Sequence, residues 1–506
     1  MSVQVVWFKR DLRIADHHPL VEASKRGPVV CLYVYEPSVW LSTEMDPSHL
    51  VFVNESLAQL NQLLAKRGGR VTFRVGEMPD VLGLLEQELG PLGGIGHLWS
   101  HQEIGNGLTF ERDKRVQRWC RAKNVPWTEI PQDGVFRGEK DRQHWGDRWQ
   151  EWMEVFPIHP PEYVQDISDV AREWCHQTSH EPQELGWRPS TKSNVQKGGE
   201  LEAWATLHSF FQERGKNYRV EMSSPERAWH SCSRMSPYLA WGNISLRTVH
   251  HETKQALLGH YQQPYSVSQQ LWVDSLRSFQ KRLRWRSHFM QKLDDQPSIE
   301  FENINSGFNG LRESDFREDW FQAWCEGQTG YPLVDACMRC LHQTGWINFR
   351  MRALLVSFAT HHLWLHWRKP ALFLARHFLD YEPGIHYSQF QMQAGTTGIN
   401  TLRVYSPVKQ AEEQDPEGIF IRRYVPELEG MPGKEAIVPH QTPVMMQHMY
   451  GCVIGRDYPL PIIDHEVSGK LARVRLHERK QSKASQQEIP AILAKHVDPH
   501  RPRRMR

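Results

Sequence analysis

The chain starts Met1-Ser-Val-Gln-Val-Val-Trp-Phe-Lys-Arg-Asp11, where the apolar run Gln4–Phe8 predicts a buried β-strand that ends at charged residues. Four further short apolar runs follow at similar spacing and also predict strands: Val29–Val34, Arg70–Val75, Gly96–Ser100 and Pro126–Ile130. Helical patterns lie between these runs: Leu50–Lys66, Pro79–Leu89 and Thr109–Lys123. This alternation of strands and helices predicts a doubly wound, parallel α/β sheet over residues 1–135.

The pattern changes after residue 135. Residues 136–200 contain five prolines and many polar turn residues, which favours a long connecting segment on the surface. From residue 201 the apolar spacing becomes helical, so residues 201–465 are expected to form an all-α domain, with a basic tail over residues 466–506. The expected helices are Leu201–Arg214, Tyr238–Asn243, Val267–Leu293, Asp315–Gln328, Tyr331–Thr344, Asn348–His366 and Pro370–Leu379.

Composition excludes several classes of protein. The chain of 506 residues contains no run of 18 apolar residues, so a membrane span is not expected. Eight cysteines are too few for a disulfide scaffold, and no apolar signal core follows the first methionine, so a cytoplasmic location is expected. The first strand is not followed by G-x-G-x-x-G, which argues against a dinucleotide site there.

Charge is distributed unevenly along the chain. The net charge is +2, but residues 466–506 contain 11 Lys and Arg against four Asp and Glu. A basic tail of this kind binds nucleic acid through phosphate contacts, or it is simply a solvated, disordered end. The sequence leaves both alternatives open.

Two segments of the second half carry candidate binding groups. Ser231–Ser245 places hydroxyls and Arg234 at the start of a helix, which suits a pyrophosphate or serves only as an N-cap. Arg352 and Asp380, the second in a loop with two acids that runs to His386, are candidates for an ion pair that lines a buried ligand site. A purely structural ion pair is the alternative.

Several motifs occur in one order and together resemble the photolyase/cryptochrome family. The resemblance covers about residues 1–465. The motifs are Trp7-Phe-Lys-Arg-Asp-Leu-Arg13 with Asp16, Ser233-Arg-Met-Ser-Pro-Tyr-Leu239, Trp324-Cys-Glu-Gly-Gln-Thr-Gly-Tyr-Pro332 with Asp335, Thr344-Gly-Trp346, Arg403–Pro407, Phe420–Leu428 and Tyr458–Ile463. The resemblance implies an α/β antenna domain and a helical domain that holds FAD, which blue light excites.

The resemblance also implies cofactor-binding residues. The Ser-Arg-Met-Ser stretch matches the phosphate contacts, and a tyrosine near the family's position precedes it. Other matches are a helix arginine beside the flavin, the ion pair and a second acid near its ring, the tryptophan of the Thr-Gly-Trp motif, and a histidine at the neighbour of flavin N5, expected to titrate near neutral pH. These residues are Tyr218, Ser233, Arg234, Met235, Ser236, Arg286, Trp346, Arg352, Asp380, Glu382 and His386.

The tryptophan chain that reduces photoexcited flavin is matched only in part. Trp367 is its middle member and Trp324 its outer member, but the flavin-proximal position is Phe390, which cannot replace tryptophan as an electron donor. Slow photoreduction is therefore expected. A detour through Trp364 is an alternative.

The lesion pocket of dimer-repairing relatives is largely altered. Of its five expected residues only Trp285 is kept, and the other four positions carry Arg282, Phe349, Ala353 and Met392. The paired histidines of the 6-4 branch are absent. Arg282 beside Trp285 is the candidate for contacts to the damaged bases.

The same resemblance raises the question of two further cofactors. Cys337, Cys340, Cys325 and Cys452 raise the question of an iron–sulfur cluster, but their positions match ordinary helix residues, so no metal is expected. His101, Glu103 and Asn106 lie where an antenna of the folate type contacts the family, so a second chromophore of unknown type remains open.

The predicted function is a FAD-dependent, light-driven DNA photolyase. It would act as a monomer on UV-damaged DNA, repairing pyrimidine dimers by electron transfer from reduced flavin. The alternative is a cryptochrome-type photoreceptor with the same FAD site, a protein partner of unknown identity and no repair activity.

Overall fold

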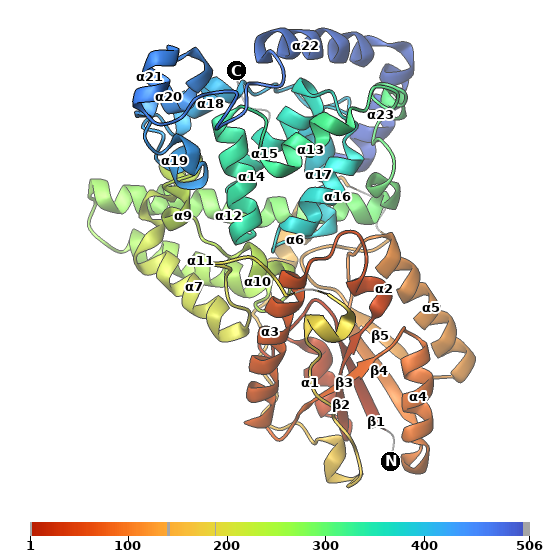
Figure 1. Ribbon diagram of the computed structural model, residues 1–506. Helices are drawn as coiled ribbons and strands as arrows, with labels where there is room; N and C mark the ends of the chain where they lie inside the picture. The colour runs from red at the N-terminus through yellow and green to blue at the C-terminus, as the bar shows by residue number, and fades with distance from the viewer. Residues whose placement is uncertain (1–2, 139–141, 188, 499–506) are drawn as a thin grey trace.

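A parallel five-stranded sheet with its helices forms the lower part of the molecule, and the helical remainder lies above it (Figure 1). The computed structural model describes residues 3–138, 142–187 and 189–498. The strand order is β3-β2-β1-β4-β5, and every adjacent pair is parallel. The strands are β1 (Val3–Phe8), β2 (Val29–Tyr35), β3 (Val71–Val75), β4 (Ile95–His101) and β5 (Trp127–Ile130). Their bounds confirm the α/β prediction.

Helices cover both faces of this sheet (Figure 1), so β1 and β2 are buried along their whole length, as the continuous apolar runs predict. The helices are α1 (His18–Ser24), α2 (Pro37–Trp40), α3 (Pro47–Ala65), α4 (Asp80–Glu88) and α5 (Gly107–Lys123). α1 was not expected from the sequence. It begins at His17, whose ring Nδ1 accepts the Leu20 N–H, a cap that the usual residue preferences do not reveal.

The connecting segment is more ordered than predicted. Residues 145–154 form α6 (Trp145–Glu154), which has a buried face, so the expectation of a segment on the surface is wrong there. Trp145, Trp149 and Met153 recur at helical spacing and are buried, and the Trp149 indole N–H donates to Ser287 Oγ at 2.8 Å. The spacing of these apolar residues favours a helix despite the nearby prolines, because it places them on one face that the helix can bury.

The helical half contains the elements that surround the candidate site. The main ones are α7 (Glu200–Gln212), α11 (Leu246–Tyr261), α12 (Val267–Asp295), α13 (Glu318–Glu326), α14 (Pro332–Thr344), α15 (Phe349–Ser357), α16 (Arg368–His377) and α17 (Pro383–Ala394). The short ones are α8 (Tyr218–Glu221), α9 (Ala228–Ser231), α10 (Ser236–Ala240), α18 (Pro407–Gln414), α19 (Ile419–Tyr424), α20 (Gly433–Ile437) and α21 (Val444–Met449). No helix within the described ranges is both long and apolar enough to span a bilayer.

One predicted helix is divided. The pattern Asn348–His366 forms α15 and then a π-helix, Phe358–His362, and Trp364 follows with a φ of +54°. The chain therefore turns before residue 366, and the segment 378–382 returns to the start of α17. The two-acid loop predicted up to His386 ends at Glu382, because Pro383 occupies the first position of α17.

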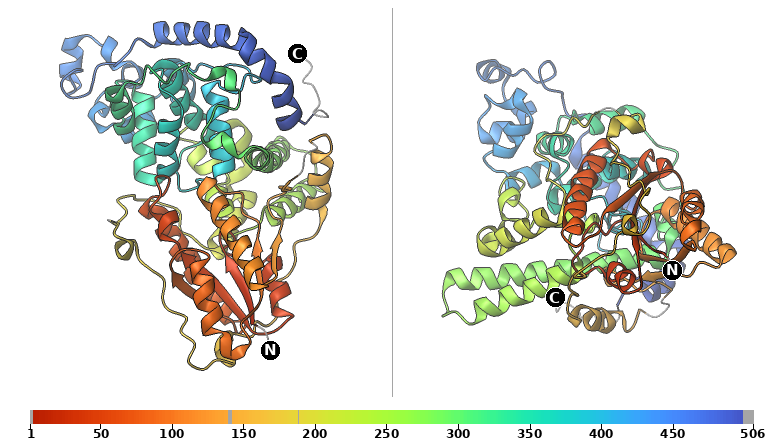
Figure 2. Two further views of the ribbon diagram at one scale, coloured as in Figure 1. Left: turned by 90° about the vertical axis from the view of Figure 1, so that its right-hand side faces the viewer. Right: turned by 90° about the horizontal axis from the view of Figure 1, so that it is seen from below.

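The basic tail forms two helices, α22 (His465–Gln481) and α23 (Lys483–His496), which lie along the upper edge of the helical half (Figure 2). The Arg475 guanidinium stacks on Trp364, 4.9 Å from its ring centre. The His496 ring Nε2 lies 2.8 Å from Gln296 Oε1. A disordered end is therefore wrong for residues 465–496. Residues 499–506 lie outside the described part of the chain.

Charged residues at the end of β1 join the two halves of the molecule. Arg10 donates to the Tyr381 carbonyl at 2.8 Å and stacks on Trp241 at 4.4 Å. Asp16 binds the Arg247 guanidinium at 2.7 Å, and both side chains are buried. The contact between Arg10 and Tyr381 fixes the segment beside Asp380 relative to the sheet.

Candidate functional site

α15, α16, α17 and the segment 378–382 surround an open pocket of about 520 Å³, a volume that includes the space open to solvent at its mouth. Five residues that the sequence placed at the cofactor or its electron path line this pocket: Arg352, Asp380, Glu382, His386 and Phe390. These residues come from separate elements, and the turn after the π-helix brings them to one place.

Arg352 and Asp380 form the ion pair that the sequence suggested. Arg352 Nη2 lies 2.8 Å from Asp380 Oδ2, while the buried Oδ1 has no hydrogen-bond partner. Burial alone would raise the pKa of Asp380, but the Arg352 guanidinium, with the Ser236 hydroxyl acting in the same direction, holds it below its usual value. An ionised carboxylate with one unsatisfied oxygen can accept an N–H from a bound ring.

A second buried ion pair lies beside the first. Arg286 of α12 donates to Glu382 Oε2 at 2.8 Å and to the Leu239 carbonyl at 2.9 Å, while its Nε has no hydrogen-bond partner and lies 3.7 Å from Asp133 Oδ1. Burial raises the pKa of Glu382 even though Arg286 opposes this shift. Two unsatisfied polar atoms, Asp380 Oδ1 and Arg286 Nε, thus occur in neighbouring pairs.

The Ser233–Ser236 stretch is shaped by aromatic contacts of Arg234. The Arg234 guanidinium lies 4.1 Å from the Trp229 ring centre and 3.9 Å from that of Trp346. Arg234 has a φ of +61°, and it exchanges two hydrogen bonds with Gln196, at 2.9 and 3.0 Å. Burial lowers the pKa of Arg234 to about 10. α10 has only five residues, so its dipole adds little to any phosphate contact.

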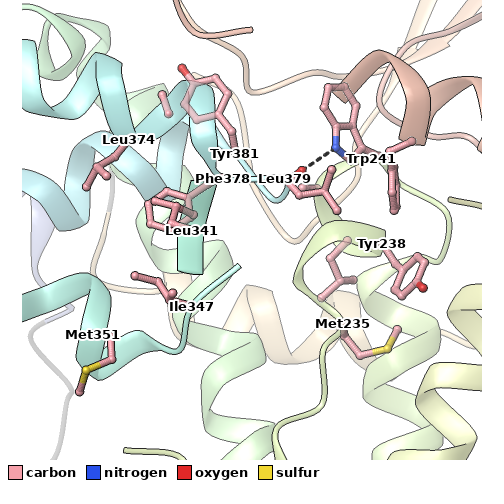
Figure 3. Close-up of a cluster of buried hydrophobic side chains, with 14 of the residues drawn as sticks. Met235, Tyr238, Trp241, Leu341, Ile347, Met351, Leu374, Phe378, Leu379 and Tyr381 are labelled. Atoms are coloured by element: carbon pink, nitrogen blue, oxygen red, sulfur yellow. Dashed lines mark hydrogen bonds between the residues drawn. The ribbon is translucent and has the colours of Figure 1, made fainter. Parts of the chain in front are cut away.

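The other residues matched to this stretch lie outside the pocket wall. Met235 and Tyr238 are buried in the apolar cluster drawn in Figure 3, where the Trp241 indole N–H donates to the Leu379 carbonyl. Tyr218 is buried against Phe210. Ser233 Oγ accepts the Met235 N–H at 3.5 Å.

His386 lies in the pocket wall but does not titrate as expected. Its Nε2 lies 2.8 Å from the Ala371 carbonyl, so this nitrogen carries the proton. Burial lowers the pKa of His386 to about 4. The expectation of a charge change between pH 5 and 8 is therefore wrong, because the ring is neutral throughout that range.

Exposed aromatic rings border the mouth of the pocket. Phe349 lines the pocket and is 41% exposed, and Trp285 is 39% exposed. The Arg282 guanidinium stacks 4.4 Å from the Trp285 ring centre and lies 5.6 Å from that of Phe349. A cation between two exposed rings can hold a base and a phosphate.

The residues matched to the electron chain are all buried. Each packs against another ring. The distances between ring centres are 5.6 Å for Phe390 and His386, 5.7 Å for Trp367 and His366, and 5.7 Å for Trp324 and Phe373. Trp324 was expected as the outer member of the chain, but it is completely buried and its indole N–H has no partner. Solvent is therefore not available to stabilise a charge on Trp324.

One group among the described residues resembles a metal site, the buried trio Asp11, His17 and His101. His17 Nδ1 accepts the Leu20 N–H, so its proton is on Nε2, which donates to Asp11 Oδ2 at 3.1 Å. A metal bound to Nε2 would require the proton to be on Nδ1. Nδ1 cannot carry it, because it already accepts the hydrogen bond from the Leu20 N–H. The trio is therefore a hydrogen-bonded set, and within the described ranges Cys325, Cys337, Cys340 and Cys452 form no such group.

The residues of the predicted antenna contact are engaged within the α/β half. Glu103 Oε2 accepts from Arg112 at 2.5 Å, His101 Nδ1 contacts Asp11 at 2.8 Å, and Asn106 caps α5. A second chromophore remains a prediction.

Gln196 and Trp229 were not found from the sequence. Gln196 lies in the connecting segment, 38 residues before the arginine that it binds, and no local motif marks either residue.

Comparisons with known proteins assign both halves of the chain. Residues 4–143 match the model of the DNA photolyase family, and residues 279–478 match that of the FAD binding domain of DNA photolyase. A deoxyribodipyrimidine photo-lyase from Agrobacterium fabrum is 27% identical over 91% of this chain and 95% of its own length. A cryptochrome DASH from Gloeobacter violaceus is 29% identical over 91% of this chain and 93% of its own length.

Solved structures agree with this assignment. A bacterial class III photolyase from Agrobacterium tumefaciens superposes with a TM-score of 0.80 at 26% identity, over 95% of this chain and 98% of that one. The chain belongs to the photolyase/cryptochrome family and contains its FAD-binding domain.

Proposed function

We propose that this protein is a blue-light-driven, FAD-dependent DNA photolyase that repairs UV-induced pyrimidine dimers by electron transfer from reduced flavin. The observation that carries the proposal is the position of the pocket. The wall formed by Arg352 and Asp380 continues through Phe349 to the exposed surface of Arg282 and Trp285. A ring in the pocket would thus lie next to a surface that suits DNA bases.

The residues present fit a flavin. Asp380 lines the pocket and its buried Oδ1 has no hydrogen-bond partner, and a ligand ring with an N–H group would satisfy this atom. FAD supplies the light absorption and the electron when it is bound. Arg352 and Asp380 would hold the polar edge of the ring, and the neutral His386 would offer an acceptor without adding charge.

Trp285 and Arg282 would hold the lesion. A damaged pair flipped out of the duplex can stack on the exposed Trp285 ring. Arg282 donates hydrogen bonds and stays charged, so it would stabilise negative charge that develops on the dimer. We also propose that the protein acts as a monomer in the cytoplasm. Eight free cysteines, six of them buried, agree with a reducing compartment.

A cryptochrome-type photoreceptor is the second candidate. Arg282, Phe349, Ala353 and Met392 replace residues that the resemblance leads one to expect in a repair pocket. The similarity to a cryptochrome DASH supports the same alternative. Such a protein would keep the FAD site, bind a protein partner and lack repair.

The Arg282→Ala variant tests the proposal. If Arg282 stabilises the charged dimer, repair should fall by about 10²–10³-fold while FAD content stays unchanged. If it only binds phosphate, damaged and undamaged DNA should lose affinity equally and the salt slope should fall by about one. Lys281→Ala, which removes the neighbouring exposed charge, is the control. A wild type that neither binds nor repairs DNA would favour the photoreceptor.

A further inference from the structure

Two buried tyrosines connect the wall of the pocket to the α/β half. Tyr381 lines the pocket and is 1% exposed, and its hydroxyl donates to Tyr387 Oη at 3.3 Å. Tyr387 is fully buried and its hydroxyl donates to Glu44 Oε1 at 3.2 Å. The side chains therefore form a chain of hydrogen bonds that ends at a buried carboxylate.

Glu44 is arranged as a proton acceptor. Asn106 Nδ2 donates to Oε1 at 3.4 Å and Thr43 Oγ1 donates to Oε2 at 3.1 Å, so both oxygens are used as acceptors. A carboxylate that faces such donors has oxygen atoms in place to accept a proton. Burial raises the pKa of Tyr381 and of Tyr387 well above the usual value, so both are neutral phenols.

Three aromatic residues near the expected electron path, Phe390, Trp364 and Trp324, are poor electron donors in this structure. Phe390 has no group that gives up an electron easily. Trp364 lies 4.6 Å from the Arg312 guanidinium and 4.9 Å from that of Arg475, and loss of an electron would place a positive charge between two cations. Trp324 is buried away from solvent.

A tyrosine avoids this cost when its proton leaves with the electron, because the product is then neutral. Arg10 lies 5.9 Å from the Tyr381 ring centre, and a neutral radical is not repelled by that cation. The hydrogen bonds through Tyr387 to Glu44 supply the path that the proton needs.

We propose that Tyr381 is the electron donor to photoexcited, oxidised flavin and that Tyr387 relays its proton to Glu44. One electron leaves Tyr381 for the flavin. The Tyr381 hydroxyl proton moves to Tyr387 Oη as the Tyr387 proton moves to Glu44, which leaves a neutral radical at Tyr381 and a protonated Glu44. The thiolate form of an external thiol then gives one electron to the Tyr381 radical and becomes a thiyl radical, and the protons move back from Glu44 to Tyr387 and from Tyr387 to Tyr381. This inference rests on the proposed FAD pocket.

The test uses FAD-loaded full-length protein under blue light with an external thiol, after FAD content has been measured. Tyr381→Phe should slow the loss of oxidised flavin by about tenfold or more, a barrier increase of at least about 1.4 kcal/mol. Glu44→Gln and Tyr387→Phe should slow it as well, since they remove the proton acceptor or the relay. Tyr33→Phe, at a buried tyrosine of β2 outside the pocket, should keep the wild-type rate.

Two measurements on the wild type do not depend on any variant. The light-induced radical should narrow in electron paramagnetic resonance spectra when tyrosine is ring-deuterated, and photoreduction should be slower in D₂O. A radical unaffected by this labelling, or a Tyr381→Phe variant with the wild-type rate, would overturn the inference.

Failure of the inference is distinguishable from failure of the proposed function. Repair by chemically reduced protein does not need photoreduction, so repair without a tyrosine effect overturns only the inference. A tyrosine effect without repair overturns only the photolyase function. Protein that cannot take up FAD would overturn both.

Discussion

Asp380 depends on Arg352, because a buried carboxylate needs a partner to stay ionised. Arg352→Ala should leave this charge unpaired and remove one contact to the ligand ring. We expect FAD affinity to fall by about ten- to hundredfold, which corresponds to about 1–3 kcal/mol for an unsatisfied buried group. Fluorescence titration of the apoprotein with FAD measures this change. Arg376→Ala, at an exposed arginine of α16, is the control, and equal affinities in the two variants would remove the ion pair from the site.

Phe390 lines the pocket, and the resemblance of the sequence predicts that it stands at the flavin-proximal position of the electron chain. Phe390→Trp should accelerate photoreduction, because indole gives up an electron far more easily than a benzene ring does. The loss of oxidised flavin under blue light with an external thiol measures the rate. If Phe390→Trp changes nothing while Trp367→Phe stops reduction, another residue connects Trp367 to the flavin.

His386 shows what the residue type alone cannot tell. The resemblance gave its position in the pocket, but its protonation is set by burial and by the Ala371 carbonyl, which is 15 residues away in the chain. The surroundings of Arg234 are likewise set by distant parts of the chain, because its aromatic neighbours Trp229 and Trp346 come from different elements. Neither contact can be predicted from local sequence.

At the scale of elements, α17 is held against α12 by a glycine. A Cβ at Gly384 would lie 2.7 Å from Met290 Cα, which is backbone and cannot move aside. Gly384→Ala should therefore separate the helices that carry Arg286 and His386. We expect a loss of about 1–3 kcal/mol in the free energy of unfolding, with a lower FAD content.

Thermal unfolding and FAD content measure this effect. Gly259→Ala in α11 is the matched control, because no atom lies within 4 Å of its Cβ position. In this helix alanine should stabilise by about 0.5–1 kcal/mol. Equal Tm values for Gly384→Ala and wild type would contradict the close packing.

The regular elements were the most predictable part of the fold. All five strands could be predicted because each is a short apolar run between turn residues, and central strands are buried on both faces. The π-helix and the turn at Trp364 could not, because the apolar spacing of Asn348–His366 continues across them. This turn, set by tertiary packing, is what brings the predicted residues of the pocket together.

At the scale of the whole molecule, buried histidines make stability sensitive to acid. Burial lowers the pKa of His49, His362 and His386 to about 4, and that of His101, His377 and His496 to about 3. In the unfolded chain these histidines bind protons as the pH falls below about 6.5, whereas in the folded protein they stay neutral down to about pH 4. The free energy of unfolding therefore decreases as the pH falls from about 6.5 toward 4.

Buried acids act in the opposite direction. Burial raises the pKa of nine described acids, that of Asp294 to about 6 and that of Glu300 to about 7 among them, but it lowers the pKa of fifteen described histidines, which outnumber the acids. The urea midpoint should therefore be lower at about pH 5 than at about pH 7.5. A midpoint that is equal or higher at the lower pH would show that these histidines are not buried as neutral rings.

Light-driven repair of a defined lesion tests the central claim most directly. An oligonucleotide that carries one pyrimidine dimer is incubated with the FAD-loaded, chemically reduced protein in blue light and in darkness. The proposed function predicts that intact pyrimidines return only in the light. Dimers that stay unchanged in the light, with FAD bound and reduced, would contradict it.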